Sequence, residues 1–379
     1  MHTNDQESLA RLCLLRCRGI GPIRYRALLK HFGTAQAALR ATPDAWRRQG
    51  LGENSLASLR KPDWKGAEQD MAWSLQTGHS LIFLGEPAYP PLLATYENAP
   101  ARLFVDGDAR VLQRPQIAMV GSRNPTAGGA ENAFEFARHL ARMGLIITSG
   151  LALGVDAASH QGCLEAGPTI AVTGHGPDRI YPARHKKLGE RIRARGAIVS
   201  EYPVGTAAAA RHFPQRNRII SAMSLGTVVV EAAVRSGSLI TARLAMEQGR
   251  EVFAIPGSIH NPMARGCHKL IREGAKLVET AEDILEELGA LAMHLAMPPE
   301  QTETAPGQEA VNPGVKEPDT EYLVLLEALG HDPLGVDHLV RRTGLTPEVV
   351  SSMLLSLELQ GHVSALGGGK YARLVRGKT

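Results

Sequence analysis

The chain has 379 residues, enough for two or three domains, and 44% of them are hydrophobic, as in ordinary globular proteins. Its four cysteines include no C-x-x-C pair, which argues against a disulfide framework and against a zinc site. No apolar stretch reaches the ~18 residues that a membrane-spanning helix needs, and the first residues lack the features of a signal peptide. We therefore expect a cytoplasmic protein that does not contact the membrane.

Residues 1–80 predict a small helical domain. Residues 1–65 carry twelve Lys or Arg side chains against five acids, an excess that would attract a polyanion; a solvated basic surface is the simpler alternative. Residues 19–22, with the sequence Gly-Ile-Gly-Pro, interrupt the helical pattern, and the proline fits the first turn of the next helix.

Residues 81–296 predict an α/β domain with an extended Rossmann-like sheet. Short, nearly continuous apolar runs alternate with longer amphipathic stretches, which indicates a parallel sheet with helices on both faces. The predicted strands are Gln116–Val120, Leu145–Thr148, Thr169–Thr173, Ala197–Ser200, Thr227–Val230 and Val252–Ile255.

Two further segments complete the predicted organisation. Residues 297–320 hold five prolines, five acids and no aromatic residue, which is typical of a flexible linker. Residues 321–379 predict three helices and a glycine-tipped hairpin, the outline of a winged helix. The helices are Tyr322–Leu329, Val336–Thr343 and Pro347–Gln360, and the hairpin spans Gly361–Leu374.

Candidate phosphate contacts follow the first three predicted strands. Ligands of open parallel sheets bind beyond the carboxyl ends of the strands. There, glycines let a phosphate approach the backbone, helix starts offer free N–H groups, and an arginine adds a forked positive charge. The candidates are Gly121, Ser122 and Arg123 after the first strand, Ser149 and Gly150 after the second, and Gly174 after the third.

Asp156 and His160 lie four residues apart on a predicted helix, so their side chains can touch. As a catalytic pair they would need a nucleophile or a substrate nearby. We favour the alternative, in which Asp156 caps the helix and His160 sits in a satisfied hydrogen bond.

The segment from residue 211 to residue 220 surrounds a phenylalanine with three arginines at the start of a helix. Arginines can hold phosphates, and an exposed Phe213 can stack on a base, which contributes ~1–3 kcal/mol. Alternatively, Phe213 belongs to the core and only the arginines are exposed. The candidates are Arg211, Phe213, Arg216, Asn217 and Arg218.

The fifth predicted strand ends at Glu231 and is followed by Ser236, Gly237 and Ser238, which open a helix with free N–H donors. Glu231 is either catalytic or orders the neighbouring loop, and we favour the ordering role. The chain contains no G-x-x-x-x-G-K-[ST], H-E-x-x-H or G-x-S-x-G motif, and no G-x-G-x-x-G after the first strand. We expect no catalytic residue, no cofactor and no metal.

These motifs, taken in order, resemble the DNA-processing protein A (DprA/Smf) family. The resemblance runs from about Leu81 to Val278 and rests on residues 120–123, 149–160, 213–220, 230–232, 236–241 and 249–257. It implies a homodimer formed through the Rossmann domain, binding of single-stranded DNA, and loading of the RecA recombinase during natural transformation. It also implies DNA contacts for Arg123, Phe213, Arg216 and Arg218.

Two details add to this resemblance. His185 stands where the family often has asparagine, which leaves the role of that loop open, while Lys186 and Lys187 after it remain candidates to face DNA. Residues 19–21 resemble a helix-hairpin-helix turn, which can present backbone amides to a phosphate; helical packing without DNA contact is the alternative.

We expect a protein without catalytic activity in which Arg123, Arg216 and Arg218 converge on phosphates while a base stacks on Phe213, with little dependence on base sequence. The alternative is a nucleotide phosphoribohydrolase-like enzyme, whose Gly-Thr…Glu strand end matches Gly226, Thr227 and Glu231 but whose P-G-G-x-G-T motif is absent. A third interpretation treats the last domain as a transcription regulator. The predicted helix over residues 347–360 carries glutamates and no Lys or Arg, so a protein–protein role suits it better.

Overall fold

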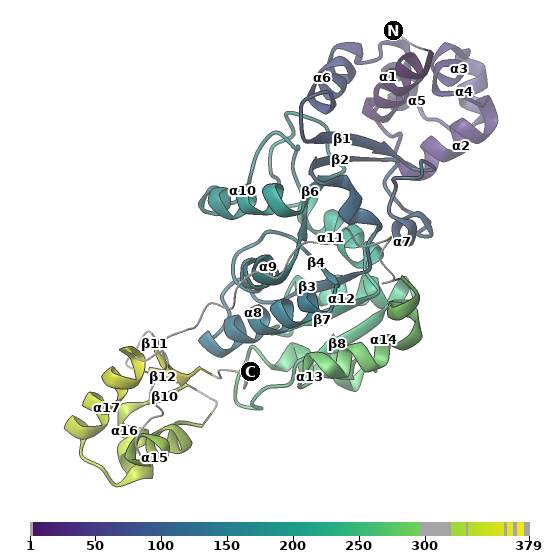
Figure 1. Cartoon of the computed structure of the whole chain (residues 1–379). Coiled ribbons are helices and arrows are strands. Elements are labelled where there is room, and N and C mark those ends of the chain that lie inside the picture. The colour runs from purple at the N-terminus through teal and green to yellow at the C-terminus, as the bar shows by residue number, and fades with distance from the viewer. Residues whose placement is uncertain (1–2, 296–319, 331–332, 360–361, 367–369, 375–379) are drawn as a thin grey trace.

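The computed structural model describes residues 3–295, 320–330, 333–359, 362–366 and 370–374 (Figure 1). Nearly all of the predicted linker and the glycines at the predicted hairpin tip lie outside these residues. No helix in the described ranges combines the length and the apolar character needed to cross a bilayer.

The first part of the chain is helical, as predicted. Leu28 is buried in the core of this part, and Leu29 and Phe32 from the same helix pack against its edge. Thr34 and Thr42 cap two of the short helices by accepting hydrogen bonds from backbone N–H groups. The helices are α1 (Thr3–Arg16), α2 (Pro22–Phe32), α3 (Ala35–Arg40), α4 (Pro43–Arg48), α5 (Glu53–Arg60) and α6 (Trp64–Ser74).

A large sheet forms the centre of the chain. Its strands are β1 (His79–Phe83), β2 (Arg102–Gly107), β3 (Gln116–Val120), β4 (Ile146–Ser149), β5 (Thr169–Thr173), β6 (Ala197–Ser200), β7 (Gly226–Val229), β8 (Glu251–Ala254) and β9 (Lys276–Leu277). Among the described residues they form one sheet in the order β1-β2-β6-β5-β4-β3-β7-β8-β9. Neighbouring strands from β6 to β9 are parallel, whereas β1 and β2 add an antiparallel pair at one edge. The six predicted strands correspond to β3–β8, with ends displaced by no more than one residue.

Helices cover both faces of this sheet, as predicted. They are α7 (Pro91–Ala94), α8 (Ala127–Arg142), α9 (Val155–Ala166), α10 (Lys186–Arg195), α11 (His212–Met223), α12 (Ser238–Glu247), α13 (Arg265–Arg272) and α14 (Ala281–Leu295), with short 3₁₀ turns η1 (Ala109–Gln113) and η2 (Ala183–His185). Because side chains alternate along a strand, Ala118 and Val120 of β3 pack with α11 and α12, while Ile117 and Met119 pack with α8 and α14.

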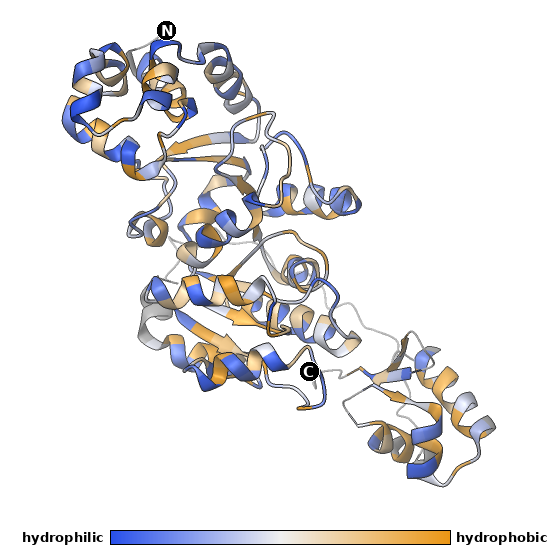
Figure 2. Cartoon of the chain, turned by 180° about the vertical axis from the view of Figure 1, so that it is seen from behind, coloured by the Kyte–Doolittle hydropathy of each residue, from blue (hydrophilic) through white to orange (hydrophobic). Residues whose placement is uncertain are grey.

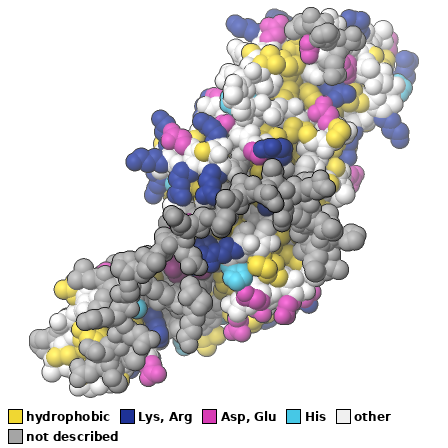
Figure 3. Space-filling view, viewed as in Figure 1, with side chains coloured by type: hydrophobic (Ala, Val, Ile, Leu, Met, Phe, Trp, Pro, Cys, Tyr) yellow, Lys and Arg dark blue, Asp and Glu magenta, His cyan; other side chains and the backbone are white. Residues whose placement is uncertain are grey.

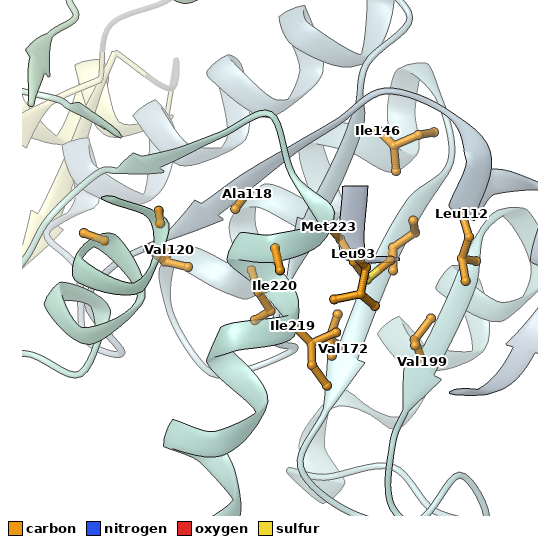
Figure 4. Packing of buried hydrophobic residues seen from close by; sticks show 14 of the residues in the cluster. Leu93, Leu112, Ala118, Val120, Ile146, Val172, Val199, Ile219, Ile220 and Met223 are labelled. Carbon is orange, nitrogen blue, oxygen red and sulfur yellow. The ribbon is translucent and has the colours of Figure 1, made fainter. Parts of the chain in front are cut away.

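Apolar packing on both faces is visible in two views. Ile219, Ile220 and Met223 of α11 lie over the sheet in the core shown in Figure 4. Figure 2 shows that the central strands are hydrophobic along most of their length, as burial on both faces requires.

The connectivity reverses at β3. From β3 the chain builds β4, β5 and β6 on one side, then returns to add β7, β8 and β9 on the other. The helix after β3 packs on one face and the helix after β7 on the other. The loops leaving these two neighbouring strands therefore diverge, which opens a crevice at their carboxyl ends.

The last domain has the predicted winged-helix outline. Its elements are α15 (Thr320–Leu329), β10 (Leu334–Gly335), α16 (Val336–Thr343), α17 (Pro347–Leu359), β11 (Val363–Leu366) and β12 (Lys370–Arg373). Strand β10 was not predicted and joins the hairpin to give the order β10-β12-β11. Its helices and sheet share a hydrophobic core, in which Leu325, Leu339, Leu354 and Val363 are buried.

Candidate nucleic-acid interface

A pocket of about 510 Å³ opens in the crevice between the loops that follow β3 and β7. It brings together predicted residues from three separate segments of the chain. These are Gly121 and Arg123 after β3, Phe213, Arg216 and Asn217 on α11, and Ser236, Gly237 and Ser238 at the start of α12.

Arg123 and Phe213 form the mouth of this pocket. The Arg123 side chain is exposed, and its Cζ lies 5.9 Å from the centre of the Phe213 ring, in a cation–π arrangement. Phe213 is half-buried, between the two predicted alternatives of core and surface, and the exposed Tyr181 ring lies 5.8 Å from it. The arrangement places a positive charge beside aromatic faces that solvent can reach.

Arg216 lies in the floor of the pocket instead of on the surface. It is only 5% exposed, and its Nη2 donates a hydrogen bond to the Gly150 carbonyl at 3.1 Å. Burial lowers the pKa of Arg216, while the nearby Asp156 carboxylate opposes that shift. We had expected an exposed Arg216 that contacts a phosphate; the structure instead buries its charge in the floor of the pocket.

Asp156 ties this floor together. Its carboxylate accepts hydrogen bonds from the N–H groups of Gly150 at 3.1 Å and Ala152 at 3.2 Å. Asp156 therefore holds the loop after β4 in place. The expectation that it caps the helix is wrong, because Gly154 occupies the N-cap of α9. Burial raises the pKa of Asp156, and the charge of Arg216 opposes this.

Arg218 does not reach the pocket, so the predicted convergence of three arginines is wrong. Its guanidinium forms an ion pair with Glu201 and donates to the carbonyl of Asn98. Residues two apart on a helix are separated by about 200° around its axis. Arg216 and Arg218 therefore point to different sides of α11.

The remaining predicted residues shape the site or lie beside it. Ser122, Ser149, Gly150 and Gly174 are buried; for example, the Ser149 hydroxyl donates to the Met119 carbonyl at 2.6 Å. Arg211 and Lys186 are exposed outside the lining. Lys186 begins α10, over which Lys and Arg side chains gather in Figure 3.

His160 and Glu231 serve the framework. His160 Nδ1 lies 2.8 Å from the Thr169 hydroxyl, as favoured, and burial lowers the pKa of His160 to about 3. Glu231 accepts hydrogen bonds from the N–H of Thr126 at 2.9 Å and from its hydroxyl at 2.6 Å. It thus orders the loop after β3, which supports the favoured role. No cluster of metal-ligating side chains occurs in the ranges that the structure describes.

Several lining residues were not predicted: Tyr181, Ala208, Ala210, Pro214, Ile240 and Thr241. Tyr181 carried a usable signal, because an aromatic residue in a loop beyond a parallel strand is a candidate for stacking. Alanines carry no such chemical signal, and their position became evident only from the fold.

The chain thus combines three parts: a helical domain, an α/β sheet with an arginine and aromatic rings at its switch point, and a winged helix. A sequence profile described as DNA recombination-mediator protein A matches residues 80–289, over half of the chain. Profiles for a DprA-like N-terminal HHH domain and a DprA winged helix domain match residues 5–61 and 299–369. The chain belongs to the DprA/Smf family.

Individual members of this family are similar over most of the chain. Protein Smf of Escherichia coli K12 is 44% identical over 315 residues, covering 82% of each chain. The DNA processing protein DprA of Bacillus subtilis is 38% identical over 284 residues, or 74% of this chain and 95% of the relative.

Two solved structures are also similar. The crystal structure of DprA from Streptococcus pneumoniae has a TM-score of 0.65 at 35% identity and covers 74% of this chain and 97% of its own. A structure of DNA processing protein A from Helicobacter pylori has a TM-score of 0.51 at 29% identity, covering 55% of this chain and 95% of its own.

Proposed function

We propose that the pocket binds single-stranded DNA and that the protein acts by binding, without catalysing a reaction. The observation that carries this proposal is the exposed Arg123 guanidinium over the Phe213 ring at the pocket mouth. The arginine suits a phosphate and the ring suits a base. The start of α12, whose N-cap Gly237 has no side-chain cap, adds the positive end of a helix.

The aromatic rings favour an unpaired strand over a duplex. Phe213 and Tyr181 offer their faces, and a base can stack on them only when it has left its own helical stack. Ala208, Ala210 and Ile240 offer no hydrogen bonds to base edges, whereas Asn217, Ser236, Ser238 and Thr241 in the same lining can form them. Because stacking on the rings accepts any base, we expect weak dependence on base sequence.

The relatives support this role. The Helicobacter pylori protein is described for its single-stranded DNA binding mode. As the family resemblance implies, we further propose that the protein hands the bound strand to the RecA recombinase in the cytoplasm during natural transformation. A homodimer formed through the α/β domain would join two pockets and gain avidity.

Arg123→Ala tests the assignment. Loss of one phosphate contact should weaken binding to a labelled oligo-dT and flatten its salt dependence by a slope of about 0.7. Phe213→Ala should weaken binding with little change in that slope, because stacking releases few counterions. The matched control is Arg142→Ala, since Arg142 is exposed at the far end of α8 and lies outside the pocket.

A salt series by fluorescence anisotropy, with a duplex of equal length alongside, measures both quantities. Wild-type affinity in Arg123→Ala, or equal affinity for single strand and duplex at physiological salt, would contradict the proposal. Thermal melting of each variant checks that the fold is retained.

A further inference from the structure

Part of the pocket wall comes from a segment whose lining side chains contribute little to holding it in place. Residues 201–211, here called the wall loop, connect β6 to α11 and place Ala208 and Ala210 in the lining. Residues 207–210 are all alanine, and methyl groups form no hydrogen bonds. Within the run, the Ala209 carbonyl accepts a hydrogen bond from the His212 N–H at 2.9 Å, and just before it the Thr206 carbonyl accepts from the Gly176 N–H at 2.9 Å. The rest of its position depends on the contacts on either side.

The anchor that precedes the alanine run comes partly from the helical domain. The Val204 N–H donates a hydrogen bond to Asp70 Oδ1 on α6 at 2.9 Å. The Val204 side chain packs against a cluster that contains Trp73 and Phe104. From the α/β domain, Asp178 Oδ1 accepts from the Gly205 N–H, also at 2.9 Å.

Asp70 is held for this contact. It is 0% exposed, and its Oδ2 accepts a hydrogen bond from Arg16 Nη1 at 2.8 Å. Arg16 Nε in turn donates to Asp63 at 2.8 Å, so the arginine has two acidic partners. A buried carboxylate is costly unless both oxygens are satisfied, and here one oxygen bonds the helical domain and the other bonds the wall loop.

We propose that Asp70 is a positioning residue for the nucleic-acid pocket. Through Val204 it fixes the wall loop, so the N-terminal helices set the geometry of Ala208 and Ala210 and thereby the affinity for single-stranded DNA. This inference rests on the proposed function of the pocket. It assigns the helical domain a role in binding that does not require that domain to touch DNA.

Asp70→Ala removes the acceptor of Val204, while Arg16 keeps Asp63. It also takes away the negative charge that acts most strongly on the buried Arg102, so the stability of the variant is measured alongside its affinity. Affinity for oligo-dT should fall by about tenfold, the factor expected when one backbone residue must be ordered on binding. The salt slope should stay unchanged, because Arg123 is intact; Arg123→Ala should instead flatten it. Asp70→Asn retains an amide oxygen for the Val204 N–H and should restore near wild-type affinity.

A local probe separates positioning from general destabilisation. Ala207 is exposed and outside the lining, and all four native cysteines are buried, so Ala207→Cys takes a spin label selectively. The label should gain mobility in Asp70→Ala. Val204→Pro removes the N–H that Asp70 accepts without removing a buried charge, and serves if Asp70→Ala does not fold.

Wild-type affinity or an unchanged label in folded Asp70→Ala would overturn the inference, provided that Arg123→Ala loses binding. If Asp70→Ala does not fold, the same results in Val204→Pro would overturn it. Wild-type affinity in Arg123→Ala would instead overturn the proposed function.

Discussion

Three arginines that look alike in the sequence lie in three different environments. Arg123 is exposed over an aromatic ring, Arg216 is buried beneath the pocket, and Arg218 is paired with Glu201. Their residue type predicted positive charge near a phosphate site; Arg123 and Arg216 line the pocket, and their contact with DNA stays a prediction. The rest depended on helix phase and on the partner acids Asp156 and Glu201, which lie far away in the sequence.

Arg216→Met should destabilise the fold. The variant leaves Asp156 buried without its opposite charge, and breaking such a pair costs about 3 kcal/mol in the free energy of unfolding. Urea denaturation measures the loss. Adding Asp156→Asn removes the stranded charge and should recover part of the stability; equal stability of wild type and Arg216→Met would show that the two groups are not coupled.

At the scale of elements, six strands without an internal charged residue were predictable and the others were not. Strands β3–β8 stand out because each contains a run of apolar residues with no charged residue inside it. Strand β2 was missed because Arg102 and Asp106 interrupt its apolar pattern, although both are buried. Asp106 is paired with Arg193 of α10 at 2.8 Å, a contact that no local pattern reveals.

The loop between β3 and α8 depends on a hydrogen-bonded pair of residues that also lie far apart in the sequence. Thr126 caps α8 through the N–H of Gly129 and also donates to Glu231 beyond β7. Thr126→Val should lower the free energy of unfolding by about 1–2 kcal/mol, through loss of the cap. In a double-mutant cycle with Glu231→Gln, the two losses should fall short of additivity; strictly additive losses would mean that the pair is not coupled.

At the scale of the molecule, the order of domains could be predicted because composition and periodicity are local properties. The joint between the first two domains could not. Leu12 and Trp73 of the helices share a buried cluster with Phe83 and Phe104 of the sheet, so these domains have a continuous core.

A continuous core predicts that the helical domain and the sheet unfold together. The three tryptophans, Trp46, Trp64 and Trp73, all lie in the first 80 residues, so their fluorescence reports the helical domain and, through Trp73, its contact with the sheet. Far-UV circular dichroism also reports the α/β domain, and the two urea curves should coincide. A fluorescence transition at clearly lower urea would show that the helical domain unfolds independently.

The reversal of connectivity at β3 has one more consequence. The opening between the two diverging loops arises from the path of the backbone. Trimming Arg123 or Phe213 should change what the crevice attracts and leave the crevice itself intact. Evolution can likewise refit such an opening for a new ligand by exchanging loop residues while the scaffold stays the same.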